Sequence, residues 1–444
     1  MSNPTKVFSE FVSDIQFSDL SSELIDIAKI PILDGFANMM AGSTQEVSGL
    51  VSQYVNSLGG NNQSTVIGHN YQTSTLLAAF INGVSGHCLD YEIQGHPATH
   101  GTSSCLPSAL ALGENRGITG KQLILSYILG WEIQARMRLS TEGVTNGAYH
   151  PPGLFGPLGA SVASSKALNF DSNKTELCLG IAASRTGGLT ANTGTMVKST
   201  HPANAARMGV ESALLVESGF TSTKNIFETE NGYSDAIFNG KVNWDIFLKD
   251  LGTRFSLIDP GFDIKRFPAQ INMQRPIEAA LNLRNNNNFD PSKVVKIHIE
   301  TSNPGHSGPI PRSGLDGKFS AWYCATVAIL DGVINIESFS DKRRFSTDVE
   351  NLLPNVTYAN NGKSTRTTAI VSATLENGTE ISGSCLDFQG STENPMSIEQ
   401  RKEKFCYCAT RIMSEHKAEE LWEDLNNLEN VDNISKIIAL SNSN

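Results

Sequence analysis

Hydrophobic residues recur at helical spacing from about residue 1 to residue 250. Leu24, Ala28, Ile32 and Phe36 share one face of a predicted helix, in which Pro31 should produce a kink or a break. The pattern predicts further helices over residues 73–84, 119–131, 159–168 and 202–218. A Thr119–Gln122 capping box marks the start of the second of these. The first half is therefore predicted to be helical.

The period of the pattern changes after about residue 255. Val295, Ile297 and Ile299 alternate with polar residues, which predicts a half-buried strand. Residues 367–384 predict a hairpin with an Asn377-Gly378 turn. A capping box at Ser397–Gln400 then predicts a return to helix through about residue 426, and we expect weak order after residue 433. The outline is helical, then α+β, then helical again.

Composition narrows the class of protein. The chain has 444 residues and a net charge of −11, which disfavours a nucleic-acid partner because phosphate binding needs a basic surface. Seven scattered cysteines without a C-x-x-C pair predict reduced thiols. There is no run of about 18 apolar residues and no leader-like N-terminus, so we expect no membrane association and a cytoplasmic location.

The segment 87–100 concentrates chemistry. His87, His96 and His100 are three of the nine histidines in the chain, and Asp90 and Glu92 lie among them. Acid–base chemistry fits because a carboxylate can orient an imidazole for proton transfer. A zinc site is a weaker interpretation, since no H-E-x-x-H motif or further ligand set completes it. Histidines that are simply satisfied within a core are the third interpretation.

Three other segments contain candidate residues. Lys198 and His201 precede a helix predicted to begin near Pro202, where an anion could bind, although a solvated loop lysine is the plainer interpretation. The glycines after His150 favour helix packing over a phosphate loop. Tyr323 fits either a core aromatic or a hydroxyl donor. No G-x-S-x-G motif is present, which disfavours a serine hydrolase of the α/β type.

Six motifs occur in an order that resembles the MmgE/PrpD family. They are Leu89-Asp90-Tyr91 with His96-Pro-Ala-Thr-His100, His150-Pro-Pro-Gly-Leu-Phe-Gly156, Gly194-Thr-Met-Val-Lys198 with His201 and Ala206-Arg207, Lys265-Arg-Phe-Pro268, Lys318-Phe-Ser320 with Tyr323, and Gly390-Ser-Thr-Glu-Asn-Pro395. Each motif is modest alone, but together they span nearly the whole chain. The family includes 2-methylcitrate dehydratase, cis-aconitate decarboxylase and iminodisuccinate epimerase.

The resemblance implies a mainly α fold. It implies a large all-helical domain built from both chain ends, with a smaller α+β domain as a lid. We place the helical domain at residues 1–255 and 395–444, and the lid at residues 256–394. The resemblance further implies a homodimer that uses no metal and no organic cofactor, and whose substrate is a small polycarboxylate.

The resemblance also implies an active site. Asp90, His100, Lys198, Lys265 and Tyr323 fall on active-site positions, and Gln94 falls where the decarboxylase branch has a threonine. In our hypothesis Lys198 and Lys265 bind carboxylates, Lys198 being also a candidate base. Asp90 orients His100 as the acid–base group, and Tyr323 donates a proton or a hydrogen bond. The remaining predicted substrate-binding residues are His96, His150, His201 and Gln270, and His87 is predicted to be structural.

Two glutamines depart from the family pattern. Gln270 stands where the decarboxylase branch has a catalytic histidine, and Gln274 where many relatives have one. An amide can hold a carboxylate but cannot transfer a proton at neutral pH. The leading prediction is therefore a lyase of the 2-methylcitrate or alkylcitrate dehydratase type. A dicarboxylate epimerase, a cis-aconitate decarboxylase and a catalytically reduced binding or structural subunit are the alternatives.

Overall fold

The computed structural model describes residues 3–362 and 367–442, and its secondary structure is mainly α-helical. Nine helices of the first half are α1 (Pro4–Asp14), α2 (Ser22–Ser43), α3 (Glu46–Leu58), α4 (Thr75–His87), α5 (Thr102–Arg116), α6 (Gly120–Ser140), α7 (Pro151–Ala167), α8 (Ser172–Ala183) and α9 (Val197–Glu217). Two short helices, α10 (Tyr233–Phe238) and α11 (Trp244–Leu248), follow them. The predicted helical first half is thus confirmed.

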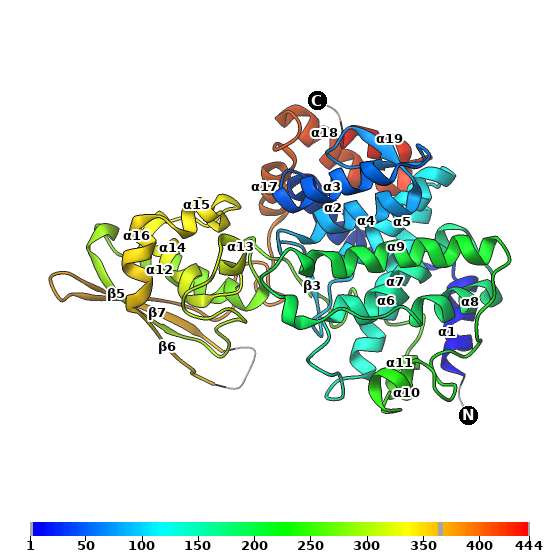
Figure 1. Ribbon diagram of the computed structural model, residues 1–444, viewed down its shortest axis with the longest axis horizontal. Helices are drawn as coiled ribbons and strands as arrows, with labels where there is room; N and C mark the ends of the chain where they lie inside the picture. Colours follow the sequence, from blue (N-terminus) through cyan, green and yellow to red (C-terminus); the bar gives the residue numbers. More distant parts are fainter. Residues whose placement is uncertain (1–2, 363–366, 443–444) are drawn as a thin grey trace.

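The helices of the first half pack around one hydrophobic cluster. Helix α7 lies against α5, α6 and α9, and its buried face includes Leu154, Phe155 and Leu158. The same cluster includes apolar residues of the C-terminal helices α17 (Ile398–Ala409) and α18 (Glu415–Asn426), both of which contact α2. Figure 1 shows these red helices beside the blue α2. We call this assembly the helical lobe.

A second hydrophobic cluster lies within residues 267–388, which we call the sheet lobe. Its sheet has the order β6-β5-β7-β8, formed by β6 (Val356–Ala359), β5 (Val294–Glu300), β7 (Ala369–Leu375) and β8 (Glu380–Cys385). β5 pairs in parallel with β6 and antiparallel with β7. Helices α12 (Gln274–Asn286) and α14 (Ala321–Asp331) contact the sheet, and Figure 1 shows this lobe beside the helices. The domain boundaries at residues 255 and 394 stay a prediction.

The predicted strand and hairpin are confirmed, with one correction of register. β7 and β8 form the hairpin, and Gly378 takes the positive φ of 83° that its turn requires. In β5 a bulge between Val294 and Lys296 shifts the alternation, so Val294 is buried while Val295 is 42% exposed. The bulge places two residues opposite one, which breaks the regular period on which the prediction rests.

Three helix predictions need correction. α2 continues through Pro31, so the alternative of a break is wrong, and a kink there stays a prediction. α9 begins at Val197, five residues before the predicted start, so Lys198 and His201 lie one turn apart on the helix. The segment expected to be weakly ordered contains α19 (Ser435–Leu440), whose Ile437 and Ile438 are buried. Tertiary packing overrides the local signals at each of these places.

Short sheets connect distant parts of the chain. β1 (Ser64–Val66) pairs with β2 (Tyr71–Thr73) beside α4. β3 (Gln94–Gly95) pairs with β4 (Phe262–Asp263), and the amide of His96 also donates to Gly261. This second pairing fastens the histidine-rich segment to the chain that leads into the sheet lobe.

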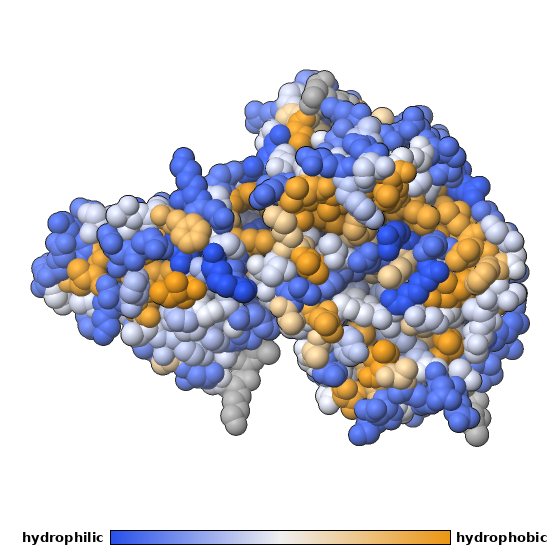
Figure 2. Space-filling view, in the orientation of Figure 1, coloured by the Kyte–Doolittle hydropathy of each residue, from blue (hydrophilic) through white to orange (hydrophobic). Residues whose placement is uncertain are grey.

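The surface of the helical lobe carries apolar side chains. Leu50, Tyr54 and Leu58 of α3 are spaced four residues apart and are each about half exposed. Figure 2 shows hydrophobic residues gathered over this part of the lobe. The homodimer stays a prediction.

No helix in the described ranges combines the length and the apolar character needed to cross a membrane.

A buried ion pair joins the two ends of the helical lobe. Lys404 Nζ of α17 lies 2.6 Å from Asp34 Oδ1 of α2, and both side chains are nearly inaccessible. The same ammonium donates to the carbonyls of Tyr91 and Lys265 at 2.9 Å. Asp34 Oδ2 accepts from the amide of Ile93 at 3.0 Å. The pair therefore holds the backbone that follows Asp90 and that of Lys265.

We predict that Lys404→Met lowers the free energy of unfolding by about 3–5 kcal/mol, because the buried Asp34 carboxylate loses its partner. Lys402→Met on the same helix is the control, since Lys402 is 36% exposed and its two ion pairs are 3.7 and 3.9 Å long. Its expected effect is within about 0.5 kcal/mol. Urea unfolding measures the free energy of unfolding of both variants. Equal losses would contradict a stabilising role for the Lys404–Asp34 ion pair.

Candidate active site

The candidate site forms where α4 ends. His87 is the last residue of α4, and Asp90 turns the chain with a positive φ of 52°, a conformation that aspartate tolerates. The amide of Asp90 donates to the carbonyl of His87 at 3.0 Å. Lys198 enters from the first turn of α9, and Lys265 follows β4. Three segments that are far apart in sequence thus meet at one carboxylate.

Asp90 lies between two buried lysines. Lys198 Nζ is 2.6 Å from Asp90 Oδ2, and Lys265 Nζ is 2.5 Å from Asp90 Oδ1. Lys265 also donates to the Asp90 carbonyl at 3.0 Å and is fully buried. Burial alone would raise the pKa of Asp90, but the charges of Lys198 and Lys265 outweigh it and hold this pKa well below its ordinary value. Asp90 is therefore ionised.

Lys198 has two further neighbours. His87 Nε2 lies 2.8 Å from its Nζ, and the Phe319 ring centroid is 5.3 Å away. Burial lowers the pKa of Lys198, although Asp90 partly offsets this. Among the described residues its ammonium has two hydrogen-bond partners, so one N–H remains for a substrate.

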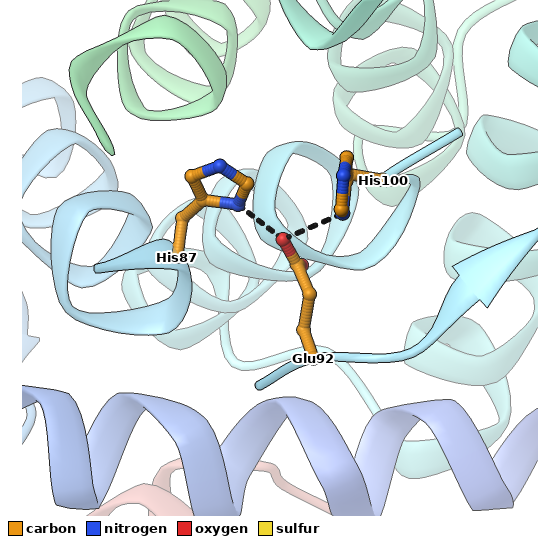
Figure 3. A group of neighbouring side chains, drawn as sticks. All are labelled: His87, Glu92 and His100. Carbon is orange, nitrogen blue, oxygen red and sulfur yellow. Dashed lines mark hydrogen bonds and ion pairs between the residues drawn. The ribbon is translucent and has the colours of Figure 1, made fainter. Parts of the chain in front are cut away.

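Glu92 contacts two histidines (Figure 3). Its Oε1 hydrogen-bonds His87 Nδ1 and lies 3.2 Å from His100 Nδ1. Ser103 donates to the same carboxylate from its amide at 3.1 Å and from its hydroxyl at 3.0 Å. The two rings meet edge to face with centroids 4.9 Å apart. The carboxylate is thus surrounded by donors.

Two more imidazoles extend this group. His150 directly precedes α7, and its Nδ1 is 3.0 Å from Nδ1 of His201 in α9. One of the two nitrogens must donate and the other accept, so the rings hold different tautomers when both are neutral. The His150 ring centroid is 6.1 Å from that of His100. His87, His100, His150 and His201 therefore form one cluster of four imidazoles.

Burial keeps these imidazoles neutral. Burial, followed by the charge of Lys198, lowers the pKa of His87 to about 3 and holds that of His150 well below its ordinary value. Burial also lowers the pKa of His100 and of His201. Lysine charges close to buried rings disfavour a second positive charge. The rings are suited to act as neutral donors and acceptors.

The charged centre lines a small cavity that borders a larger cleft. The cavity of about 20 Å³, which holds roughly one water molecule, is lined by His87, Asp90 and Lys198. It shares wall residues, including Thr195 and Leu315, with a cleft of about 590 Å³. That volume is typical of small-molecule sites. Walls from α3 and the turn before α9 face walls from the sheet lobe, so the cleft lies between the lobes.

The structure assembles most of the predicted site. Asp90, Lys198 and Lys265 are in direct contact, and His100, His150 and His201 belong to the adjoining cluster. His96 lies outside it, with its Nε2 3.1 Å from Asp263 Oδ1 and its side chain 36% exposed. Gln94 is buried in β3, where its backbone pairs with that of Asp263.

Three predicted roles need correction. Glu92, not Asp90, is the carboxylate that contacts His100. Tyr323 is fully buried in the core of the sheet lobe, and its hydroxyl donates to the Ser338 carbonyl at 2.6 Å. Burial raises the pKa of Tyr323, which disfavours proton release. The structural role predicted for His87 leaves out its direct contact with Lys198.

Both glutamine side chains bind backbone groups of nearby residues. Gln270 Oε1 accepts from the amide of Asn272 at 3.0 Å. Gln274 is fully buried and makes three 3.0 Å hydrogen bonds to the backbone of Phe267 and Ala269. Gln274 therefore fixes the chain that follows Lys265. The predicted substrate contact of Gln270 stays a prediction.

Sequence reasoning missed two residues of the centre. Glu92 was visible as an acid within the histidine segment, but spacing does not say which of two acids meets which ring. Lys318 belongs to one of the family motifs, but no role was predicted for it. Its Nζ donates to the Leu89 carbonyl at 2.9 Å, and burial lowers its pKa to about 8. Lys318 also lines the larger cleft.

The matches to known families agree with this geometry. Residues 6–245 match the MmgE/PrpD N-terminal domain, and residues 267–430 match the MmgE/PrpD C-terminal domain. The chain belongs to the MmgE/PrpD family. The sequence-based identification is therefore confirmed over most of the chain.

Several curated relatives of this MmgE/PrpD protein carry one name. This chain is 29% identical to the cis-aconitate decarboxylase of Homo sapiens over 98% of its own length and 94% of that protein. It is 29% identical to that of Mus musculus over 98% of this chain and 93% of the relative. The cis-aconitate decarboxylase of Aspergillus terreus is 25% identical, covering 99% and 96% of the two chains. These names support the lyase class, and they do not specifically support dehydration.

We predict that the free energy of unfolding falls as the pH drops from about 7 to about 5. The unfolded chain then binds protons on imidazoles whose pKa is about 6.5, whereas the folded His87 and His150, whose pKa values burial holds well below that, bind fewer. Each such ring contributes a slope of up to about 1.4 kcal/mol per pH unit.

Urea unfolding of the wild type and of His150→Gln at several pH values measures this slope, which should be shallower in the variant. His416→Gln, at an exposed histidine of α18, is the control for loss of an imidazole. A slope that His150→Gln leaves unchanged would show that His150 is not a buried neutral ring.

Proposed function

We propose that this protein is a cofactor-independent lyase that acts on a small polycarboxylate, with decarboxylation of cis-aconitate or a close analogue as its leading reaction. The observation that carries the proposal is the Asp90 carboxylate held between the buried ammonium groups of Lys198 and Lys265. The names of the relatives favour decarboxylation over the dehydration that the sequence analysis placed first.

The charge of the site favours an anionic substrate. Lys198, Lys265 and Lys318 supply three ammonium groups, whereas Asp90 and Glu92 supply two carboxylates. With the imidazoles neutral, one positive charge is in excess within a buried region. Such a charge is costly without a partner and attracts a counter-ion. A substrate carboxylate that reaches the free N–H of Lys198 supplies one.

The reaction needs both charge stabilisation and a proton. Loss of CO2 from the CH2-linked carboxylate of cis-aconitate shifts the double bond and leaves negative charge on the carbon beside another carboxylate. One proton must then bind that carbon, so the overall change is one CO2 lost and one proton gained. Lysine ammonium groups stabilise the enolate-like charge. Lys198 is our candidate for the proton donor, and its lowered pKa makes this transfer easier.

Dehydration of an alkylcitrate is the second candidate. It is favoured by Gln270 and Gln274, which occupy the positions where the family resemblance implies histidines. Neither amide can exchange a proton at neutral pH, and Gln274 is fully engaged with backbone groups. In this reaction Lys198 or His100 removes a proton beside a carboxylate before hydroxide leaves.

One experiment separates the reactions. The purified protein is incubated with cis-aconitate, 2-methylcitrate and iminodisuccinate in deuterated water. We expect CO2 release from cis-aconitate, with one deuterium in the product. A new ultraviolet-absorbing alkene from 2-methylcitrate would instead support dehydration, and deuterium exchange without net turnover would support epimerisation. No turnover and no exchange with any of the three would contradict the proposal and favour a binding subunit.

The same assay tests the metal question. His87, Glu92 and His100 form one group, within the described ranges, whose atoms are close enough to surround an ion. The Glu92 carboxylate already meets both rings and Ser103, and Lys198 lies against His87. We therefore expect activity to survive exhaustive EDTA treatment. Loss of activity that zinc restores would assign the group to a metal.

We predict that Lys198→Met and His100→Gln each lower kcat at least about 100-fold, the usual effect of losing an acid–base group. Lys241→Met, at an exposed lysine, is the matched control and should keep the wild-type rate. Thermal melts check that each variant is folded. Wild-type turnover in folded Lys198→Met would exclude Lys198 as the proton donor.

A further inference from the structure

We propose that Glu92 is a positioning residue that fixes the tautomer of His87, and with it the orientation of the Lys198 ammonium group. His100 lies beside the same carboxylate, with its Nδ1 3.2 Å from Glu92 Oε1. The catalytic consequence rests on the proposed function, whereas the tautomer itself does not.

The hydrogen bonds of Glu92 leave one consistent assignment. The side chain is 1% exposed, and it hydrogen-bonds the amide and hydroxyl of Ser103 and Nδ1 of His87. Nδ1 of His100 lies 3.2 Å from its Oε1. An ionised carboxylate only accepts hydrogen bonds. His87 therefore carries its hydrogen on Nδ1, and we expect the same of His100, whose Nδ1 faces the same oxygen. Because buried His87 is neutral, its Nε2 is left with a lone pair.

That lone pair determines how Lys198 is held. His87 Nε2 faces Lys198 Nζ at 2.8 Å and accepts one of its N–H groups. Asp90 accepts a second at 2.6 Å. An ammonium group is tetrahedral, so two fixed N–H directions determine the third. Glu92 thus acts through His87 to aim the remaining N–H of Lys198, although it does not touch Lys198 itself.

The variant Glu92→Gln would reverse the donor and acceptor roles in this chain of hydrogen bonds. The amide of Ser103 needs an acceptor, so the glutamine oxygen takes the place of Oε2 and its NH2 takes the place of Oε1. The NH2 then faces the two Nδ1 atoms, which must accept, and the rings move their hydrogen to Nε2. His87 Nε2–H would point at the ammonium of Lys198, donor against donor. The variant keeps the shape of the side chain and loses the alignment of Lys198.

The test is nitrogen NMR of protein labelled with ¹⁵N-histidine, together with kcat on the best substrate of the panel. His87→Gln and His100→Gln assign the two signals among nine histidines. We expect the neutral Nδ1–H tautomer for both rings in the wild type and the Nε2–H tautomer in Glu92→Gln. We expect kcat to fall about 100-fold in that variant, because Lys198 is no longer aligned.

The matched control is Glu114→Gln. Glu114 also accepts from a backbone amide and a hydroxyl, both of Thr65, at 2.7 and 2.6 Å, and no imidazole of the described residues hydrogen-bonds it. It should leave the histidine signals and kcat unchanged.

A wild-type His87 that is charged or protonated on Nε2 would overturn the proposal, as would an unchanged His87 tautomer in folded Glu92→Gln. If Glu92→Gln does not fold, the His87 tautomer in the wild-type spectrum alone tests the proposal. Histidine signals that shift after EDTA treatment would assign the group to a metal and also overturn it. A chain inactive on every polyacid but with the expected tautomers would refute the proposed function and leave the role of Glu92 standing.

Discussion

The site depends on one buried carboxylate shared by two buried ammonium groups. Asp90 joins the end of α4 to α9 through Lys198 and to the chain after β4 through Lys265. Buried charges are stable only when they are paired and hydrogen-bonded. Removing one of the three groups would leave a buried charge without its partner, which destabilises the fold. The positions of three segments are therefore coupled to one another at Asp90. Any shift of α9 changes the charge balance at the centre.

The support of this carboxylate comes from both ends of the chain. Asp34 binds the amide of Ile93, and Lys404 binds the carbonyls of Tyr91 and Lys265. Lys318 adds a contact to the carbonyl of Leu89 from the sheet lobe. The backbone of residues 89–93 is thus fixed from α2, α17 and the sheet lobe together. A turn with a positive φ at Asp90 is maintained by these contacts on either side of it.

The sequence predicted the composition of the site better than its contacts. Family motifs identified Asp90, Lys198 and Lys265, and periodicity identified the helical halves and the hairpin. The pairing of Glu92 with His100 was not predictable, because two acids two residues apart are equivalent in a sequence pattern. Tyr323 was misplaced because a motif position does not show the direction of its hydroxyl. The start of α9 was misjudged because Pro202 signals a helix start, whereas packing extends the helix to Val197.

The cleft between the lobes has a consequence for how substrate range can change. Its walls include Gln45, Ser313 and Ser340, which do not line the small cavity at Asp90 and Lys198. Substitutions there alter the shape offered to a substrate while the charged groups around Asp90 keep their surroundings. A scaffold with this separation can acquire new substrates by mutation of the cleft wall alone, so one buried apparatus can serve enzymes with different specificities.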